Sequence, residues 1–299
     1  MGIILKELVH VMKIAIVTDS TAYLSDEEVR ANNITVVPIP VILDGQVYDE
    51  GKDITPAEYY TKLRSAKTFP STSQPPVGEM IHLYENLRNE GYEKVISIHL
   101  ANTISGFQQT LRTIAPEIDG LEVTVYDSQI TVKLMGWLVL EAAHMVEAGA
   151  DVPAIIERLD DLRASMGEYF IVNDLQNLVR GGRLSNAAGF IGGMLKIKPL
   201  LTFDDESHKI VAIEKIRSLK KAYARAETLF QEELDQIDYP VRGLVIHAND
   251  PDAAAKWQAD LTEKFPEVPF ETSYFGPVIG THLGEKAIAI AWMKDFTKA

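Results

Sequence analysis

The chain is 299 residues long, 46% hydrophobic and free of cysteine, and it carries a formal net charge of −14. The lack of cysteine excludes disulfides and thiolate chemistry, and the acidic balance argues against nucleic-acid binding, which needs a basic surface, and against attraction to anionic lipid. A chain of this length exceeds the usual limit of one hydrophobic core, so we expect two domains with a cleft between them.

The first residues, 1–11, are interpreted as a short N-terminal extension rather than a signal peptide. Lys6 and Glu7 interrupt the apolar start, and no cleavage site of small residues follows. Elsewhere, no apolar run approaches the roughly 20 residues that span a bilayer. We therefore expect a soluble, cytoplasmic protein without stable membrane insertion.

Strands and helices alternate in the first half of the chain. Apolar runs predict buried strands at residues 13–18, 36–43, 94–100 and 122–126. Helix starts lie between them, with a capping box at Ser25 and a Thr55-Pro56 start followed by Glu58. This alternation predicts a mostly parallel, Rossmann-like sheet that binds ligands beyond the carboxyl ends of its strands.

The pattern restarts after two further predicted helices, at residues 134–146 and 154–166. Strands are predicted at residues 169–172, 200–203, 209–213, 243–247, 270–274 and 287–292, and helices near 218–233 and 253–265. We therefore predict an α/β protein with an N-terminal α/β domain (residues 12–166), a C-terminal α/β domain with a mixed sheet (residues 167–299) and a cleft between them.

Four short segments rich in small and polar residues predict one shared pocket. They are residues 71–75, 104–107, 181–185 and 280–284, which we interpret as loops beside apolar elements. Polar loops held by rigid elements are where binding groups usually lie.

Several side chains in these segments suit an anion, although each also has a structural interpretation. The hydroxyls of Thr72 and Ser73 lie in a stretch stiffened by prolines and can donate to a carboxylate or cap a helix. Ser105 can cap the following helix or lie beside amides that hold an anion. Arg183 supplies a cationic fork after two glycines, which can equally end a helix, and His282 can polarise a carboxyl group or be structural.

Common nucleotide and metal signatures do not occur in the sequence. It contains no G-x-x-x-x-G-K-[ST], no G-x-G-x-x-G after a strand, no H-E-x-x-H and no G-x-S-x-G. We therefore predict no site for ATP, a dinucleotide or zinc. Two alternatives stay open: a hydrolase or small-molecule transferase that uses Ser105 or Ser128 with His282 as base, and a regulatory lipid sensor.

Residues 180–225 are basic within an acidic chain, with ten Lys or Arg against four Asp or Glu. Five of the cations cluster where a strand meets a helix: Lys215, Arg217, Lys220, Lys221 and Arg225. The cluster is either a solvated face or a docking surface for an acidic partner.

Taken together, four motifs resemble the DegV family of bacterial fatty-acid-binding proteins. The motifs are Thr18-Asp19-Ser20, Thr72-Ser73-Gln74-Pro75, residues 178–201 with Gly181-Gly182-Arg183 and Lys196-Ile197-Lys198-Pro199, and residues 280–284. The match runs from about residue 12 to residue 296. The resemblance implies two α/β domains that enclose one long-chain fatty acid, with its acyl tail in a tunnel and its carboxyl group near the domain junction.

The resemblance also implies roles for individual residues. Thr72 and Ser105 would contact the carboxyl group, and Arg183 and His282 would lie close to it. The possible additional pocket residues are Ser73, Gly106, Phe107 and Thr281. Phe107 replaces a frequent threonine and could narrow the pocket, and Glu285 would raise the pKa of a nearby histidine if it lay close.

The function implied by the resemblance is that of a carrier rather than an enzyme. Arg217 matches a position that docks a fatty acid kinase, and Lys220 and Lys221 lie beside it. The protein would shield the acyl chain and present the carboxyl group to this separate ATP-dependent kinase, which makes the acyl phosphate. Its expected ligand is the long-chain fatty acid, and no cofactor or metal is expected.

Overall fold

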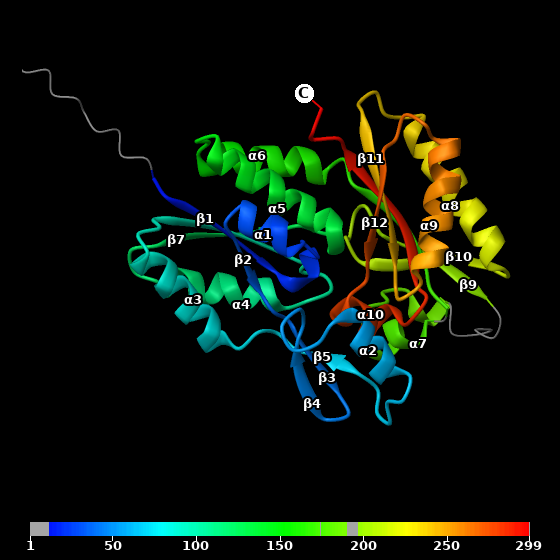
Figure 1. The fold of residues 1–299 in the computed structure, drawn as a ribbon, viewed down its shortest axis with the longest axis horizontal. Helices are drawn as coiled ribbons and strands as arrows, with labels where there is room; N and C mark the ends of the chain where they lie inside the picture. Colours follow the sequence, from blue (N-terminus) through cyan, green and yellow to red (C-terminus); the bar gives the residue numbers. More distant parts are fainter. Residues whose placement is uncertain (1–11, 174, 190–196, 299) are drawn as a thin grey trace, which may run out of the picture.

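The computed structural model describes residues 12–173, 175–189 and 197–298. The predicted extension at residues 1–11 and Lys196 of the family motif lie outside the described residues. Figure 1 shows two α/β halves side by side, with a small third sheet beneath them.

The first half is built on a four-stranded sheet in the order β2-β1-β6-β7, and every neighbouring pair is parallel. Its strands are β1 (Ile14–Asp19), β2 (Ile34–Val37), β6 (Lys94–His99) and β7 (Glu122–Asp127). Its helices are α1 (Asp26–Ala31), α3 (Val77–Asn89), α4 (Phe107–Ile114), α5 (Val132–Glu147) and α6 (Val152–Arg163), with short turns η1 (Ser20–Ala22) and η2 (Ala115–Glu117). α5 and α6 lie on one face and α3 and α4 on the other (Figure 1). The prediction of a parallel, Rossmann-like sheet is confirmed.

Residues 36–43, predicted as one strand, belong to two different sheets. β2 ends at Val37, and β3 (Pro40–Leu43) begins a separate antiparallel sheet in the order β4-β3-β5. Its other strands are β4 (Gln46–Asp49) and β5 (Ser71–Thr72), and α2 (Pro56–Leu63) lies between them in the chain. The single-strand prediction is wrong because Pro38 and Pro40 lack the N–H groups that continuous pairing needs.

The second half is built on a six-stranded mixed sheet in the order β10-β9-β8-β13-β11-β12. The strands are β8 (Gly167–Ile171), β9 (Lys198–Phe203), β10 (Ile210–Ile216), β11 (Val241–His247), β12 (Phe270–Tyr274) and β13 (Ile288–Lys294). The helices are α7 (Gln176–Gly181), α8 (Leu219–Leu234), α9 (Pro251–Lys264) and α10 (Pro277–Leu283), with a short turn η3 (Ala187–Gly189). β11 and β12 are parallel and the other pairs antiparallel, which confirms the predicted mixed sheet.

The two faces of β13 differ in side-chain size between residues 288 and 292. On β13, Ile290 and Trp292 pack in the cluster that includes residues of α8 and α9, which cover the outer face (Figure 1). Ala289 and Ala291 point the other way, into the core shared with the first half. Because alternate residues of a strand face opposite sides, this part of β13 presents large side chains outward and alanines inward.

Residues 280–284, predicted as a loop, form the end of a helix. α10 begins with Pro277 at its first position and ends at Gly284, whose φ of 80° suits glycine. Gly280 lies inside the helix, and Tyr60 packs against it so closely that a side chain would not fit. A Cβ there would lie 2.2 Å from the Tyr60 hydroxyl. The glycine reflects close packing rather than a turn, so the loop prediction is wrong. No helix of the described residues is long and apolar enough to cross a membrane.

Candidate ligand-binding site

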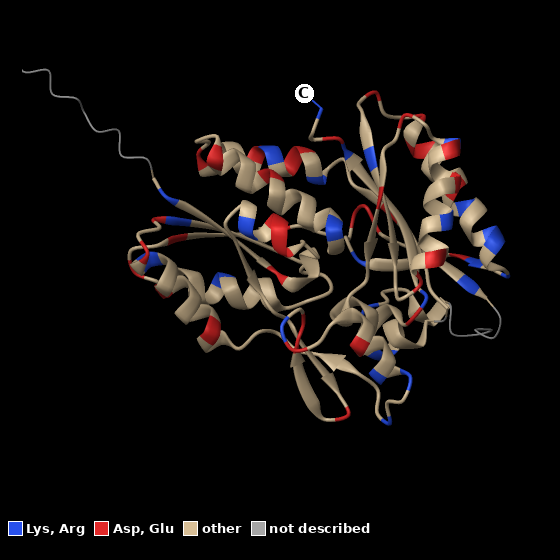
Figure 2. Cartoon of the chain, in the orientation of Figure 1, with Lys and Arg blue, Asp and Glu red and all other residues tan. Residues whose placement is uncertain are grey.

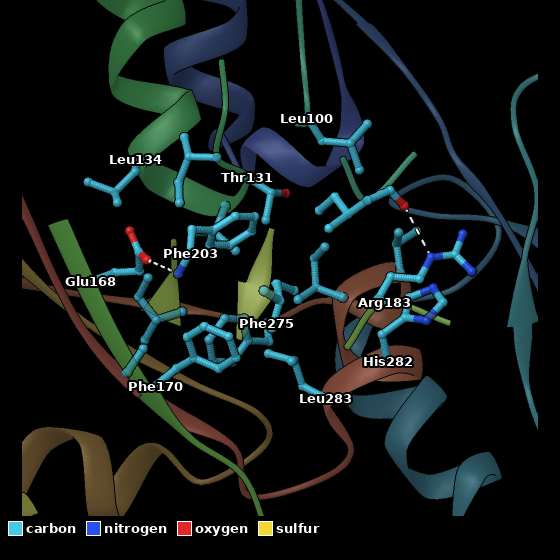
Figure 3. Close-up of a pocket in the computed structure, with 18 of the residues that line it drawn as sticks. Leu100, Thr131, Leu134, Glu168, Phe170, Arg183, Phe203, Phe275, His282 and Leu283 are labelled. Carbon is cyan, nitrogen blue, oxygen red and sulfur yellow. Dashed lines mark hydrogen bonds between the residues drawn. The ribbon is translucent and has the colours of Figure 1, made fainter. Parts of the chain in front are cut away.

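A long, largely apolar cavity of about 810 Å³, including the part open to solvent, lies between the two halves (Figure 3). The first half contributes residues that follow its parallel strands, such as Ile39, Leu100 and Ile130, and the start of α5. These positions lie at the carboxyl ends of the strands, where open α/β sheets bind ligands.

The inward alanines of β13 make room for this cavity. Ala289 lies opposite Phe170 of β8, and Ala291 lies opposite Glu168. All four residues line the cavity. Larger side chains at the two alanine positions would fill the space between the sheet and the first half.

Four candidate residues from separate parts of the chain line the cavity: Thr72 on β5, Ser105 after β6, Arg183 after α7 and His282 on α10. In Figure 3, Arg183 and His282 lie together at one end of the cavity, and Glu168 lies at the other. A hydrogen bond connects Thr72 to His282, and another connects Arg183 to Ile104, the residue before Ser105. These polar residues therefore form one end of the site, as their shared-pocket interpretation requires.

His282 is held between both halves of the molecule. Its Nε2 lies 2.9 Å from Thr72 Oγ1, and a Cβ at Gly181 would lie 2.7 Å from its Nδ1. Burial, together with the nearby Arg183 guanidinium, lowers the pKa of His282 to about 4. The imidazole is therefore neutral at pH 7, with one nitrogen able to donate and the other able to accept.

Arg183 brings a cation to the same end. Its Nε donates to the carbonyl of Ile104 at 3.1 Å, and another guanidinium nitrogen donates to the carbonyl of Gly181. Burial lowers the pKa of Arg183, but a guanidinium still stays protonated at neutral pH. The two bonds orient the group and involve two of its five N–H donors.

Glu285 does not act on His282 as the sequence suggested. Its carboxylate pairs with Arg64 at 2.5 Å and accepts a hydrogen bond from Asn249 at 2.6 Å. The pKa of His282 is lowered by burial and by Arg183. The expectation that Glu285 raises the pKa of a nearby histidine is therefore wrong for His282.

Phe107 and Gly106 lie away from the cavity wall. Phe107 is fully buried and packs edge-on against His99, with 4.8 Å between the ring centroids. Gly106 packs against Gln74, whose Nε2 would lie 2.7 Å from an added Cβ. Phe107 therefore fills the core of the first half rather than narrowing the cavity.

Ser73 and Thr281 make structural contacts beside the polar end. Ser73 is exposed, and its backbone N–H donates to the carbonyl of Pro40. Thr281 is buried, and its hydroxyl contacts Tyr59 and donates to the carbonyl of Pro277, both at short distance. Thr281 also lines a depression beside the polar end, together with Thr72 and His282.

The serines of the hydrolase alternative are engaged elsewhere. Ser128 is fully buried, and its hydroxyl is 2.8 Å from the carbonyl oxygens of both His99 and Ile130. Ser105 Oγ accepts a hydrogen bond from the N–H of Phe107. Since His282 Nε2 contacts Thr72, the described residues pair His282 with a threonine rather than with either serine.

A different hydrogen-bonded series of Asp, His and Ser side chains occurs in the core of the first half. Asp19 Oδ2 lies 3.0 Å from His99 Nδ1, and His99 Nε2 lies 2.7 Å from Ser97 Oγ. All three side chains are fully buried. A substrate cannot reach the buried Ser97. These hydrogen bonds therefore stabilise the sheet rather than activate a nucleophile.

Glu168 is a residue that the sequence interpretation missed. Its carboxylate accepts hydrogen bonds from the N–H of Phe203 at 2.7 Å and from Thr202 Oγ1 at 3.0 Å. Burial raises the pKa of Glu168 to about 7. One signal was available: Glu168 has the parity of the buried Phe170 in a strand, which places it on the inward face.

The predicted docking residues lie on the second half. Arg217, Lys220 and Lys221 are exposed where β10 leads into α8, and the ribbon in Figure 2 is blue at several Lys and Arg positions along this part of the molecule. Ile210, at the start of the same strand, lines the cavity. No group of three or more His, Asp or Glu side chains that could hold a metal occurs within the described ranges.

The profile of a family described as "Uncharacterised protein, DegV family" matches residues 13–295. The chain belongs to the DegV family. A DegV domain-containing protein of Listeria monocytogenes is 46% identical to it over 280 residues, which cover 94% of this chain and 98% of the relative. The DegV protein of Bacillus subtilis is 42% identical over 282 residues, which cover 94% of this chain and 99% of the relative.

Solved structures of DegV proteins share the fold. The crystal structure of DegV from Bacillus subtilis, described as a fatty acid binding protein, superposes with a TM-score of 0.86 at 41% identity and covers 95% of this chain and all of that one. A fatty acid binding DegV family protein from Streptococcus agalactiae superposes with a TM-score of 0.87 at 36% identity, covering 95% and 99% of the two chains.

Proposed function

We propose that this protein binds one long-chain fatty acid and presents its carboxyl group to a separate ATP-dependent fatty acid kinase. The observation that carries the proposal is the polarity of the cavity, which has an apolar wall along most of its length and Thr72, Ser105, Arg183 and His282 at one end. The descriptions of the Bacillus subtilis and Streptococcus agalactiae structures support the ligand class.

The acyl chain would supply most of the affinity. Burying fourteen methylenes at about 0.8 kcal/mol each contributes roughly 11 kcal/mol before the costs of ordering and association are subtracted. A buried carboxylate costs several kcal/mol unless it is hydrogen-bonded or paired. The polar end therefore offsets this cost and fixes which end of the ligand lies there.

Each polar residue has a distinct part in this arrangement. Arg183 supplies the balancing positive charge, and its hydrogen bond to the Ile104 carbonyl holds it beside the segment that carries Ser105. The Thr72 and Ser105 hydroxyls can each donate to a carboxylate oxygen. Neutral His282 can exchange its contact with Thr72 for one with the ligand, which would free the Thr72 hydroxyl to turn.

The position of the polar end also supports presentation to a partner. Thr72, Arg183 and His282 line both the apolar cavity and the depression beside it, which Phe69 and Arg180 border. A carboxyl group at this end would lie close to the surface, while the acyl chain stayed covered. The kinase would dock on Arg217, Lys220 and Lys221, and the cytoplasm would be the site of this exchange.

The ligand proposal is tested by organic extraction of the purified protein followed by mass spectrometry. We expect about one fatty acid per chain, and loss or depletion of that lipid in a folded Thr72→Ala/Ser105→Ala variant. Ser73→Ala is the matched control, because this exposed serine follows Thr72 but lies outside the cavity lining. A wild-type protein that carries no lipid and takes up none when fatty acids are supplied would rule the proposal out.

A further inference from the structure

The end of the cavity opposite His282 is not uniformly apolar. Leu134, Phe170 and Phe203 surround it, but the carboxylate of Glu168 lies among them (Figure 3). A plain acyl tail offers no hydrogen bond, so a carboxylate is an unexpected group at the place where the methyl end would lie.

Glu168 is held firmly in this position. Its carboxylate accepts hydrogen bonds from the Phe203 N–H and the Thr202 hydroxyl, both on β9. Both donors are neutral groups, so they orient the carboxyl group but supply no balancing positive charge, and its charged form predominates only above the raised pKa of about 7. β8 and β13 fix its backbone, since Glu168 pairs with Ala291.

A polar surface depression begins behind Glu168. Glu168, Phe203 and Ile130 line both the apolar cavity and this depression. Apart from Ala164 and Met166, the further lining of the depression is charged or polar and includes Arg163 and Asp205. Glu168 and Phe203 therefore stand at the boundary between an apolar compartment and a polar one.

We propose that Glu168 sets the upper limit of acyl-chain length by ending the apolar compartment with a fixed carboxylate. This inference rests on the proposed fatty-acid-binding function. A chain whose methyl end stops before Glu168 leaves the carboxylate in contact with water. A longer chain has to displace that water or push the carboxylate off its two donors, and both cost free energy.

The proposal predicts a break in how affinity depends on chain length. Each buried methylene strengthens binding about fourfold, so affinity rises along a series of saturated fatty acids until the tail reaches Glu168. Beyond that length the wild-type affinity should level off or fall. In Glu168→Leu, whose side chain is apolar and untethered, the rise should continue, by about 15-fold for two further methylenes.

The experiment measures dissociation constants of that series for wild type, Glu168→Gln and Glu168→Leu. Glu168→Gln keeps the shape and an acceptor oxygen for the Phe203 N–H but removes the charge, so we expect a smaller relaxation of the limit than in Glu168→Leu. A chain too short to reach Glu168 is the internal control, and its affinity should be the same in all three proteins. A damaged fold would weaken short and long chains together.

Identical length profiles in the three proteins would overturn the role of Glu168. That result would leave fatty-acid binding itself intact. If instead the wild type bound no member of the series, the proposed function would fail, and the two outcomes are distinguishable in one data set.

Discussion

The Thr72 hydroxyl on β5 and the His282 imidazole on α10 contact each other at 2.9 Å across 210 positions of sequence. Thr72 belongs to the small hairpin sheet of the first half, and His282 to the second half. The polar end of the cavity therefore forms only when both halves are folded and in contact. A ligand bound at this end would therefore contact residues of both halves.

The pKa of His282 should rise when the ligand binds. In the unloaded protein, burial and Arg183 lower this pKa to about 4, so the ring is neutral at pH 7. A carboxylate beside the ring favours the imidazolium, so we expect an increase of about one unit or more. NMR titration of isotope-labelled histidine, with and without fatty acid, measures it. An unchanged pKa on loading would place the carboxylate elsewhere.

Gly181→Ala should weaken fatty-acid binding without unfolding the protein. The added methyl would lie 2.7 Å from His282 Nδ1, so the imidazole must shift away from Thr72. We expect roughly a tenfold or larger loss of affinity, the size of one lost hydrogen bond to a charged group. Gly78→Ala is the control, because a Cβ there meets open space on α3. Equal affinities for the two variants would contradict the prediction.

Asp19→Ala should destabilise the fold. Asp19 is fully buried and accepts hydrogen bonds from the backbone and hydroxyl of Thr21, from Leu100 N–H and from His99. Removing it leaves these donors unsatisfied, at a cost of about 3–5 kcal/mol. Urea denaturation measures the free energy of unfolding. Asp26→Ala, at an exposed position of α1, should cost less than about 1 kcal/mol.

Glu50 should make stability fall as pH rises. Burial raises its pKa from 4.5 to about 7, even though its carboxylate accepts hydrogen bonds from Ser20 and from the N–H of Val278. Between these two values the folded state holds a proton that the unfolded state has lost, so the free energy of unfolding decreases with pH. The loss is on the order of 3 kcal/mol and is complete above about pH 8.

Glu50→Gln removes this titration while keeping an acceptor oxygen for Val278. Denaturation curves of both proteins at several pH values give the comparison. We expect the free energy of unfolding of the variant to exceed that of the wild type increasingly from about pH 5 to pH 8. Parallel pH profiles would show that Glu50 keeps the same protonation state in the folded and unfolded protein.

Charge reversal at the predicted docking surface should separate partner binding from lipid binding. Arg217→Glu/Lys220→Glu should lower affinity for the proposed fatty acid kinase partner by at least about tenfold, since opposite charges across an interface guide association. The fatty acid content should stay unchanged. Lys256→Glu, exposed on α9, is the control. Unaltered kinase turnover with the double variant would place the docking surface elsewhere.

The strands and helix starts were predictable because short-range physics decides them. Apolar runs gave β1, β6 and β7 nearly to the residue, and the capping boxes at Ser25 and Thr55 are both formed. The polar end was predictable for a different reason. Small polar residues beside apolar elements usually lie where a backbone or ligand comes close. Each of the four segments contributes at least one residue to the lining of the cavity.

The errors come from contacts between residues distant in sequence. Gly280 suggested a loop, because the sequence does not show that Tyr60 packs against it. Phe107 follows a polar segment but packs on His99. Glu168 was overlooked because its significance depends on the alanines of a strand more than a hundred residues later. The boundary between residues 166 and 167 stays a prediction, since α10 packs against β3, β5 and α2 of the first half.

The walls of the cavity come from both halves, and this has a consequence for turnover in the cell. A ligand that binds only the folded protein stabilises it in proportion to the logarithm of ligand concentration. Unloaded chains would open more often and be degraded faster by proteases. We expect the amount of this protein in the cell to rise and fall with the concentration of its lipid ligand, because the unloaded protein would be degraded faster.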